Sequence, residues 1–541
     1  MEKAFEMGKT SATGSFQLLI GVAASTIIMA VNTIILQILL SRDAYGLYGI
    51  VLVPSMLINL FRDLGLNSAM TRYIAGLRVS HRDEEIHEFI VTGLIFETLS
   101  GIAFSLLSLF LASFIASTFF HRPEPAASCI EILSLSIIAG SLLAASQAGF
   151  IGFERMELNS FTLICQAIVK TAVSLTLVFL GYSILGAVIG YTVGFVAAGA
   201  IGLATFYVFL LRPLRKKLTR NTGAHARTNI TKTLKTMLNY GMPISIGTAL
   251  AGILTQIYAF MIIPLTTNAT YADYVVASYF AVLLTFFTTP IATVLFPAFA
   301  KLDIEKEPEL VKTVFTSSIK YSSILVVPAT MALMVLSGPI VGTLFGQKYV
   351  NAPFFLTIAV VGTLFITAGS LSATGFLSGL GETGTIMKQN IITIIVGIPL
   401  GILLIPAYGI TGLIVAGILA LVPSTIWVLH WIWRNYETKA DFKSSAKILV
   451  ASAIAALLAY LPAAFLNAAH VIKLVIGLVI FLAVYVLGAP IMGAVSLSDI
   501  NSLRTMFSGL GIISKIMNAP LNAAEKAARV RSANKEAHEG H

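Results

Sequence analysis

Apolar segments of roughly 20 residues recur along most of this sequence, and each is long enough to cross a hydrocarbon layer about 30 Å thick as an α-helix. Because lipid offers no hydrogen-bond partners to the backbone, a spanning segment must satisfy its own N–H and C=O groups, and we expect helices. Hydrophobic residues make up 57% of the chain and charged residues only 11%. The sequence therefore predicts an all-α polytopic membrane protein.

The apolar runs predict about 14 transmembrane helices. They are expected at residues 14–40, 46–69, 89–118, 127–152, 159–181, 184–211, 238–265, 274–299, 321–345, 354–379, 389–406, 410–432, 448–467 and 474–495. The expected organisation is a first six-helix lobe (1–211), a basic linker (212–237), a second six-helix lobe (238–433), two further helices (446–495) and a polar tail (496–541).

The distribution of lysine and arginine predicts the orientation, since these residues are retained in short cytoplasmic loops. With a cytoplasmic N-terminus, 29 of the 35 basic residues fall in cytoplasmic segments. Both termini are therefore expected in the cytoplasm of a plasma membrane protein. The segment 212–235 carries eight basic residues and no acidic one, which favours contact with anionic membrane lipids over binding of nucleic acid.

An internal repeat is indicated by features that recur at one offset of 226 residues. The matched pairs are Tyr45 and Tyr271, Tyr48 and Tyr274, Gly149 and Gly375, Phe150 and Phe376, Tyr182 and Tyr408, Ile184 and Ile410, and Gly186 and Gly412. A six-helix unit returns the chain to its starting side, so the two copies are expected to be parallel. Parallel repeats suit alternating access around a site at their interface.

Five ionisable residues fall inside predicted spans, where charges are costly and usually functional. They are Arg62, Asp63, Glu97, Glu131 and Lys170. The offset of 226 places uncharged residues at the matched positions, namely Thr288, Thr289, Ser323, Thr357 and Val396. We therefore expect the first lobe to handle a charged substrate or a coupling ion.

Structural alternatives exist for each of these charges. Arg62 and Asp63 lie near a predicted helix end, where snorkelling or a turn would explain them equally well. Glu131 fits the headgroup region. Glu97 and Lys170 lie at depths of roughly 12 and 17 Å from the cytoplasmic side, by the rise of 1.5 Å per residue, and are predicted to be neighbours as an ion pair or a transport site.

Several segments together resemble the polysaccharide transporter branch of the multidrug/oligosaccharidyl-lipid/polysaccharide (MOP) superfamily, the Wzx-type flippases. They include LLSRDAYGLYGIVLVPSMLINLFRDLGLNSAMTRYIAG, GFIGFERMELNS, LFGQKY and LIPAYGITGLIVAG. The resemblance covers residues 10–495 and implies a MATE-like arrangement of two six-helix lobes with two extra C-terminal helices. It also implies transfer of a polyprenyl-diphosphate-linked oligosaccharide to the outer leaflet, with proton or sodium coupling.

This resemblance assigns expected roles to the charged residues. Lys170 and Arg62 are the cations available to a substrate diphosphate, and Glu97 or Asp63 would load a coupling H⁺ or Na⁺. Neither a metal site nor an organic cofactor is expected. The expected partners are the lipid-linked oligosaccharide, membrane lipids, and glycosyltransferases or a polymerase of the same pathway, with a monomer as the default state.

Two other classes of function compete with the flippase. A cation-coupled multidrug exporter of the same superfamily is the alternative, although such exporters generally have twelve spans. A membrane glycosyltransferase would need a catalytic constellation, and the predicted external loops contain only Asp43, Glu124 and Asp273 as acidic residues, with no DxD pair. We therefore expect a transporter and not an enzyme.

Overall fold

The computed structural model describes residues 2–222, 229–285, 287–289, 291, 295, 299, 306–439, 442–508 and 512–539, and the regular structure in these ranges is helical throughout. The α-helices are α1 (Glu2–Leu39), α2 (Arg42–Arg62), α3 (Leu66–Val79), α4 (Asp83–Phe114), α5 (Ala126–Gly152), α6 (Met156–Leu177), α7 (Ser183–Phe206), α8 (Arg212–Thr222), α9 (Ile230–Ile262), α10 (Asn268–Val282), α12 (Pro308–Val335), α13 (Ser337–Phe345), α14 (Ala352–Ala359), α15 (Ser370–Gly379), α16 (Thr383–Tyr436), α17 (Phe442–Phe465), α18 (His470–Ile491), α19 (Leu497–Ser508) and α20 (Ile512–Glu539). Shorter helical turns are η1 (Ile115–Phe119), η2 (Val178–Tyr182), η3 (Tyr207–Leu211), η4 (Ile263–Leu265) and η5 (Val360–Ala368).

Within the described ranges, ten helices are long and apolar enough to cross a membrane, or eleven if the bent pair 352–368 and 370–379 forms one span. The protein is thus a multi-pass membrane protein, but the expected count of about 14 is not confirmed. Two of the ten stretches, Met156–Thr219 and Thr383–Tyr436, each join two predicted spans across a kink, at Gly181 and Gly409. The predicted span 274–299 lies partly outside the described residues.

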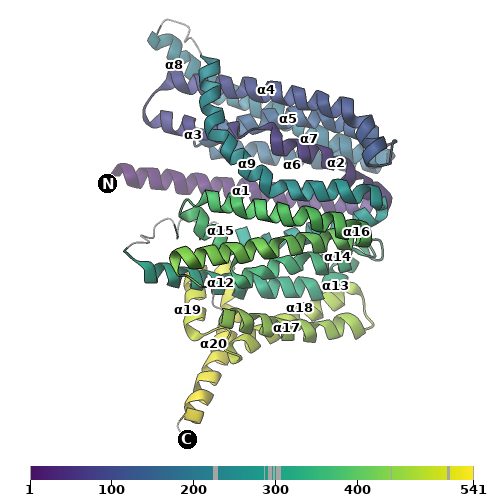
Figure 1. Cartoon of the computed structure of the whole chain (residues 1–541), viewed down its shortest axis with the longest axis vertical. Helices are drawn as coiled ribbons and strands as arrows, with labels where there is room; N and C mark the ends of the chain where they lie inside the picture. Colours follow the sequence, from purple (N-terminus) through teal and green to yellow (C-terminus); the bar gives the residue numbers. More distant parts are fainter. Residues whose placement is uncertain are drawn as a thin grey trace. The chain divides into compact units, whose positions relative to one another are not determined.

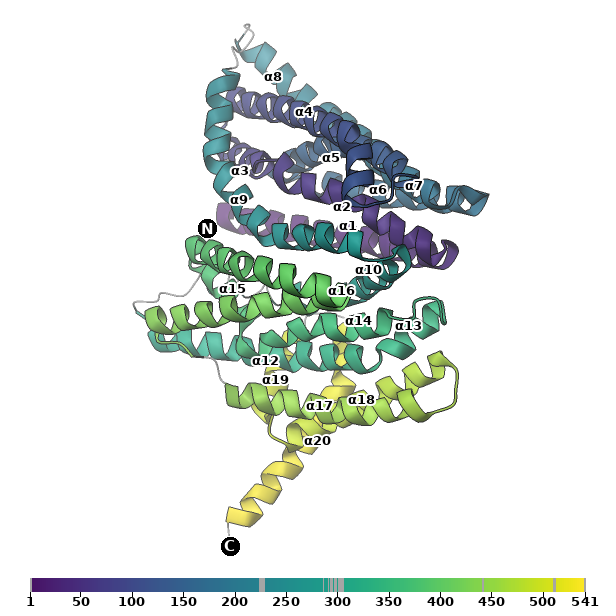
Figure 2. The same cartoon turned by 45° about the vertical axis from the view of Figure 1, so that its right-hand side comes forward.

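The chain divides into two compact units, Met1–Ala272 and Asp273–His541. In the first unit α4, α5, α6 and α7 pack along one another, and α1 packs on α6 (Figures 1 and 2). Helix α9 also belongs to this unit, where it packs against α2, α3 and α4. A core of apolar side chains around Phe150 and Phe206, whose rings meet edge to face at 5.8 Å, joins α3, α4, α5 and α7.

Glycines on α7 allow it to pack closely against α6. A β-carbon added at Gly186, Gly190 or Gly194 would lie within 3 Å of Leu177, Ser174 or Lys170 respectively. These glycines are spaced four residues apart and so lie on one face of the helix. Small residues at this spacing let two transmembrane helices approach along their backbones, which explains why α6 and α7 form a tight hairpin.

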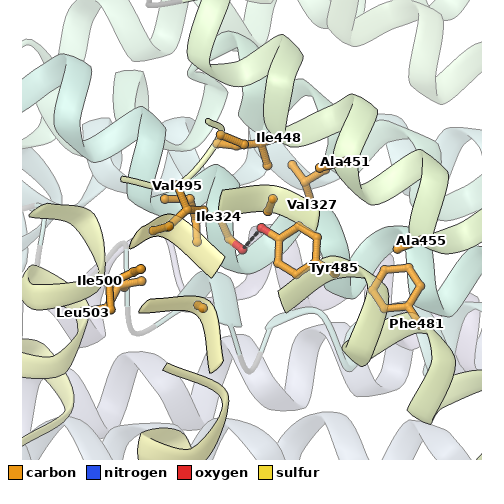
Figure 3. Close-up of a cluster of buried hydrophobic side chains, with 14 of the residues drawn as sticks. Ile324, Val327, Ile448, Ala451, Ala455, Phe481, Tyr485, Val495, Ile500 and Leu503 are labelled. Atoms are coloured by element: carbon orange, nitrogen blue, oxygen red, sulfur yellow. Dashed lines mark hydrogen bonds between the residues drawn. The ribbon is translucent and has the colours of Figure 1, made fainter. Parts of the chain in front are cut away.

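In the second unit, α12, α17 and α18 enclose an apolar core that also takes in the two tail helices (Figure 3). Tyr485 of α18 donates a hydrogen bond from its hydroxyl to the carbonyl oxygen of Ile324 at 2.9 Å across this core. Ile500 and Leu503 of α19 and Leu521 of α20 are buried in the same cluster. The described part of the polar tail is therefore helical, and α19 and the middle of α20 pack on this core.

An ion pair also fixes the tail to this unit. The Lys320 ammonium of α12 lies 2.6 Å from the Asp499 carboxylate of α19. The same carboxylate oxygen accepts hydrogen bonds from the Ser496 backbone N–H and hydroxyl, each at 2.7 Å, and so caps the start of α19.

The two units share local geometry at the offset of 226 residues. Ser183 has φ 46° and ψ −128°, and Gly409, at the matched position, has φ 58° and ψ −132°. In both units the chain reverses at this position, and α16 is drawn as two rods lying side by side (Figures 1 and 2). A β-carbon on Gly186 or on its counterpart Gly412 would lie less than 3 Å from the backbone of the preceding rod. Each hairpin thus requires glycine at the same place.

One helix in each copy of the repeat starts in the same way. Helix α2 begins at Arg42 and α10 begins at Asn268, 226 residues later. The Ser41 hydroxyl accepts a hydrogen bond from the Ala44 N–H at 3.1 Å, and the Thr267 hydroxyl accepts one from the Thr270 N–H at 3.2 Å. These matched caps and reversals support the internal repeat at the level of local structure.

Candidate functional site

A break in an otherwise continuous helical run separates α2 from α3 in the first unit. Leu64 and Gly65 have positive φ angles of 48° and 78°, which end α2 and redirect the chain. The backbone of Gly65 lies so close to Gly241 of α9 that a β-carbon on either glycine would approach the other's carbonyl oxygen within 2.5 Å. Broken helices of this kind, with free polar backbone ends inside a membrane domain, commonly form ion and substrate sites in transporters.

Charged side chains occupy both sides of this break. The Asp63 carboxylate accepts a hydrogen bond from the Asn67 backbone N–H at 2.9 Å and so satisfies one free donor at the start of α3. The Arg62 guanidinium turns toward α5, where its Nη1 donates to the Ser141 hydroxyl at 2.7 Å and to the Ile137 carbonyl at 3.2 Å. Arg62 is 6% exposed. It is therefore a buried cation and not a snorkelling one.

Glu97 of α4 completes this group, which we call the α2–α3 charge cluster (Arg62, Asp63, Asn67 and Glu97). Its carboxylate is 1% exposed, accepts a hydrogen bond from the Asn67 side-chain amide at 3.0 Å, and has Arg62 and Asp63 as its charged neighbours. One cation and two ionised carboxylates would leave a net charge of −1 in a cluster where Arg62 and Glu97 are buried and Asp63 is partly buried. A proton or a monovalent cation would neutralise it, because uncompensated buried charge is strongly unfavourable.

The cluster also has unused hydrogen-bonding capacity. Arg62 Nε is buried and has no hydrogen-bond partner among the described residues, and Glu97 and Asp63 are near enough to share a hydrogen bond when one of the two carboxyls is protonated. Most buried polar atoms in folded proteins are paired, so an unpaired guanidinium nitrogen beside two adjacent carboxyls suggests a place for a proton or a further ligand.

Lys170 lies elsewhere in the first unit, on α6 opposite Gly194 of α7. Its ammonium lies 4.6 Å from the centre of the Tyr191 ring, a cation–π contact. Within the described ranges Lys170 has no carboxylate partner. Because no acid is paired with this lysine, an anionic group could pair with its ammonium without displacing a carboxylate.

The predicted contact between Glu97 and Lys170 is absent from the described interactions of either side chain. Glu97 instead faces Arg62, Asp63 and Asn67, whereas Lys170 faces Tyr191. Three of the four predicted site residues are therefore together, and the fourth lies on the α6–α7 hairpin. Depth in the membrane placed Glu97 and Lys170 near the same level, but it carried no information on the direction in which each helix presents its side chain.

Side chains of α7 lie between Lys170 and the neighbourhood of Arg62. The rings of Tyr191 and Phe195, both on α7, have centroids 5.0 Å apart. The Phe195 ring and Arg62 Nη1 each lie 3.5 Å from the point where a β-carbon on Gly140 of α5 would stand. The glycine thus lets the aromatic ring and the guanidinium approach the same spot.

The remaining sequence-predicted positions carry no comparable cluster. Glu131 is exposed on α5, which agrees with the headgroup interpretation and does not test it. In the second unit, Ser323 is fully buried with an unpaired hydroxyl, and the Thr357 hydroxyl bonds to Ser337 at 3.0 Å. No charged cluster therefore stands at these matched positions in the described part of the second unit.

Sequence reasoning missed four residues that shape this region. They are Asn67, Ser141, Tyr191 and Gly140. Asn67 follows Asp63 by four residues, so a helix-start signal at the break could have identified it. Neither Ser141 nor Gly140 carries a sequence signal, because their importance depends on which helix faces Arg62.

The sequence profile of the polysaccharide biosynthesis protein family matches residues 11–303, more than half of the chain. The chain belongs to this family. The matched range includes all four predicted site residues. The assignment confirms the resemblance to the polysaccharide transporter branch of the MOP superfamily.

Two curated relatives extend the comparison. The chain is 25% identical over 199 residues to the probable low-salt glycan biosynthesis flippase Agl15 of Haloferax volcanii, a match that covers 37% of this chain and 42% of that relative. It is 22% identical over 455 residues to the uncharacterized membrane protein MJ1068 of Methanocaldococcus jannaschii, covering 82% of this chain and 88% of the relative. The first match spans less than half of Agl15.

Solved structures show which fold the family member adopts. The lipid II flippase MurJ in an inward closed conformation superposes with a TM-score of 0.69 at 17% identity, covering 87% of this chain and 99% of that structure. An inward-facing MATE-family multidrug transporter of the MOP superfamily gives a TM-score of 0.61 at 14% identity, covering 78% and 98%. The fold is therefore that of MurJ and MATE transporters, and those comparison proteins with a stated role are flippases or transporters.

Proposed function

We propose that this protein is a flippase that moves a polyprenyl-diphosphate-linked oligosaccharide from the inner to the outer leaflet by alternating access. The observation that carries the proposal is membership of the polysaccharide biosynthesis protein family over a range that contains the α2–α3 charge cluster and Lys170. Surface polysaccharide or glycoprotein assembly would follow translocation. We propose glycosyltransferases or a polymerase of the same pathway as partners of the protein, and the plasma membrane as its location.

Lys170 is the proposed cation for the substrate diphosphate. Its ammonium has an aromatic neighbour and no carboxylate partner in the described structure, so an incoming phosphate would not have to displace an acid. The α2–α3 charge cluster is the proposed coupling site, where H⁺ or Na⁺ would offset the net negative charge. Arg62 is there a structural counter-ion as well as a candidate phosphate ligand.

Communication between the two places would run through α7 and α5. An anion that draws Lys170 away from Tyr191 would let that ring move against Phe195. Phe195 and Arg62 both lie beside Gly140, so a shift of Phe195 would reach the surroundings of Arg62. Such a path changes the equilibrium between two conformations of the transporter only if the ion and the substrate each bind one conformation better than the other. The break at Leu64 and Gly65 is the proposed flexible element.

The test is translocation of a fluorescent polyprenyl-diphosphate sugar in proteoliposomes under imposed H⁺ and Na⁺ gradients. We expect wild type to translocate the lipid, Lys170→Ala to lose translocation, and Lys170→Arg to retain part of it. Lys348→Ala is the matched control, because this lysine also lies over a tyrosine ring, at 5.6 Å from Tyr349, but in the second unit.

Absence of translocation by folded wild-type protein under every gradient would contradict the flippase proposal. Export of small cationic dyes by the same proteoliposomes would then favour the multidrug exporter. Normal translocation by Lys170→Ala, with wild type active, would retain the flippase and place the diphosphate site elsewhere.

A further inference from the structure

A basic cavity lies at the end of the α6–α7 hairpin, where α7 continues through η3 into α8. Its volume is about 460 Å³, and its lining residues are Tyr207, Arg212, Arg215, Lys216 and Thr219. Three of the five are cations and none is acidic. Neither the α2–α3 charge cluster nor Lys170 contributes to it, so this is a separate place in the first unit.

Contacts to α4 and to the core hold α8 in position. Lys217 pairs with Asp83 at the start of α4, and Arg215 Nε donates a hydrogen bond to His87 Nε2 at 3.2 Å. Leu214 packs into the apolar core of the first unit. The cavity is therefore built on a fixed helix and is not merely a set of exposed side chains.

Two of the cations remain available to a ligand. Arg212 and Lys216 are exposed, and neither has an ion-pair partner within the described ranges. They lie four residues apart on one face of α8, so their charges converge on the same cavity. Tyr207 and Thr219 complete the lining, and the Thr219 hydroxyl, which donates its hydrogen to the Arg215 carbonyl at 3.0 Å, leaves Tyr207 as the neutral donor. Cations that form charge-assisted hydrogen bonds are the groups that recognise a phosphate.

An exposed apolar surface adjoins the cavity. Tyr207, Val208 and Phe209 of η3 are 48%, 48% and 51% exposed. They lie in the apolar stretch Met156–Thr219, three to five residues before Arg212, the first cation of α8. A lipid offers the matching arrangement, with acyl chains beside the apolar residues and a phosphate beside the cations, whereas a free phosphate ion would use only the second part.

The repeat supplies a partly similar cavity in the second unit. Trp433 matches Tyr207 at the offset of 226, and it lines a cavity of about 660 Å³ with His430, Arg434, Glu437 and Lys439. The Lys439 ammonium lies 4.8 Å from the Trp433 ring. An aromatic residue beside cations therefore recurs at the matched position of each copy of the repeat. The two cavities differ in that Glu437 lines the second, whereas no carboxylate lines the first.

We propose that the Arg212–Lys216 cavity binds the phosphate of an anionic phospholipid headgroup, with the lipid's acyl chains lying along η3. Basic cavities at the ends of transmembrane helices bind such headgroups because several cations reach one phosphodiester. This site is independent of the proposed translocation site. Its occupant is a membrane lipid and not the transported substrate.

The experiment titrates the purified full-length protein in nonionic detergent with phosphatidylglycerol or phosphatidylcholine and counts bound lipids by native mass spectrometry. We expect phosphatidylglycerol to be retained in preference to phosphatidylcholine. The double variant Arg212→Gln/Lys216→Gln should bind phosphatidylglycerol roughly 30-fold more weakly, from the loss of two charges near a lipid surface. Arg215 is left unchanged because it anchors α8 to His87.

The matched control is Lys232→Gln/Lys235→Gln, which removes two exposed charges from α9 outside the cavity. It should bind phosphatidylglycerol as wild type does, and the charge-conserving variant Arg212→Lys/Lys216→Arg should retain most of the affinity. If both double glutamine variants bind phosphatidylglycerol equally weakly, the binding depends on total charge and not on this cavity, and the proposed site is overturned. Millimolar inorganic pyrophosphate should not displace bound phosphatidylglycerol. If it displaces this lipid completely, the lipid assignment is overturned in favour of a free-phosphate site.

Discussion

Arg62 and Ser141 are 79 residues apart in the sequence and joined by a hydrogen bond of 2.7 Å. This bond ties the end of α2 to the middle of α5, and it holds the guanidinium where it can offset the charges of Asp63 and Glu97. Removing the cation and removing the hydrogen bond should therefore have different consequences.

We predict that Arg62→Ala destabilises the detergent-solubilised protein by about 3–5 kcal/mol, because the buried Glu97 carboxylate and the partly buried Asp63 carboxylate lose their counter-ion. Ser141→Ala removes one hydrogen bond to a charged group and should cost about 1.5–3 kcal/mol. Thermal unfolding monitored by size-exclusion chromatography measures both. A double variant Arg62→Ala/Glu97→Gln should recover part of the loss, and an additive result would show that the two side chains are not coupled.

Glu97→Gln tests the role of the cluster in ion coupling. The glutamine carbonyl can still accept the hydrogen bond from Asn67, so the fold should be kept. The cluster, however, would lose one negative charge and with it the need for a coupling cation. We expect translocation in proteoliposomes to become independent of the H⁺ and Na⁺ gradients. Retained gradient dependence would move the coupling role to Asp63 or to another site.

The repeat could be predicted from sequence because it depends on residues with restricted conformations. Tyr182, Gly186 and their counterparts Tyr408 and Gly412 marked two places where the structure reverses the chain with similar φ and ψ angles. Glycine at a close backbone approach cannot be replaced without strain, so the constraint is visible in the sequence.

The pairing of charges could not be predicted in the same way. Depth follows from counting residues, but a helix turns about 100° with each residue. Glu97 could therefore face Lys170 or the α2–α3 break at almost the same depth, and only the packing of α4 against α2, α3 and α5 decides. Tyr191 and Gly140 gain their meaning from that packing alone.

Gly186→Ala and Gly412→Ala provide a matched test of the two hairpins. The added methyl group would lie 2.9 Å from the Leu177 backbone in the first hairpin and 1.9 Å from the Leu404 carbonyl in the second. Overpacking of this kind costs about 1–3 kcal/mol, so both variants should unfold at lower temperature than wild type. Gly488→Ala in α18 is the control, because a β-carbon there meets nothing within 4 Å. If Gly412→Ala alone is neutral, the hairpins are not equivalent.

The tail should loosen in acid. Hydrogen bonds from Arg504 and then from Arg529 hold the pKa of the Glu525 carboxyl below its ordinary value. A lowered folded-state pKa stabilises the packed tail above the unfolded pKa of roughly 4.3, and this contribution is lost as the pH falls through the folded value. Limited proteolysis of α20 by an acid-active protease should therefore accelerate below about pH 4. Glu525→Gln should show the faster cleavage already at higher pH, and a pH dependence unchanged by this variant would assign it to other groups.

The orientation of the chain is open to a direct test with single cysteines. The native Cys129 and Cys165 would first be replaced with serine, and cysteine would then be placed at Val350, Thr219 or Val530, all three exposed in the structure. Because 29 of the 35 basic residues fall on the side that we assign to the cytoplasm, Val350→Cys should react with an impermeant maleimide in intact cells. Thr219→Cys and Val530→Cys should react only after the membrane is permeabilised. Labelling of Thr219→Cys and Val530→Cys in intact cells, with Val350→Cys protected, would reverse the topology and with it the proposed direction of lipid transfer.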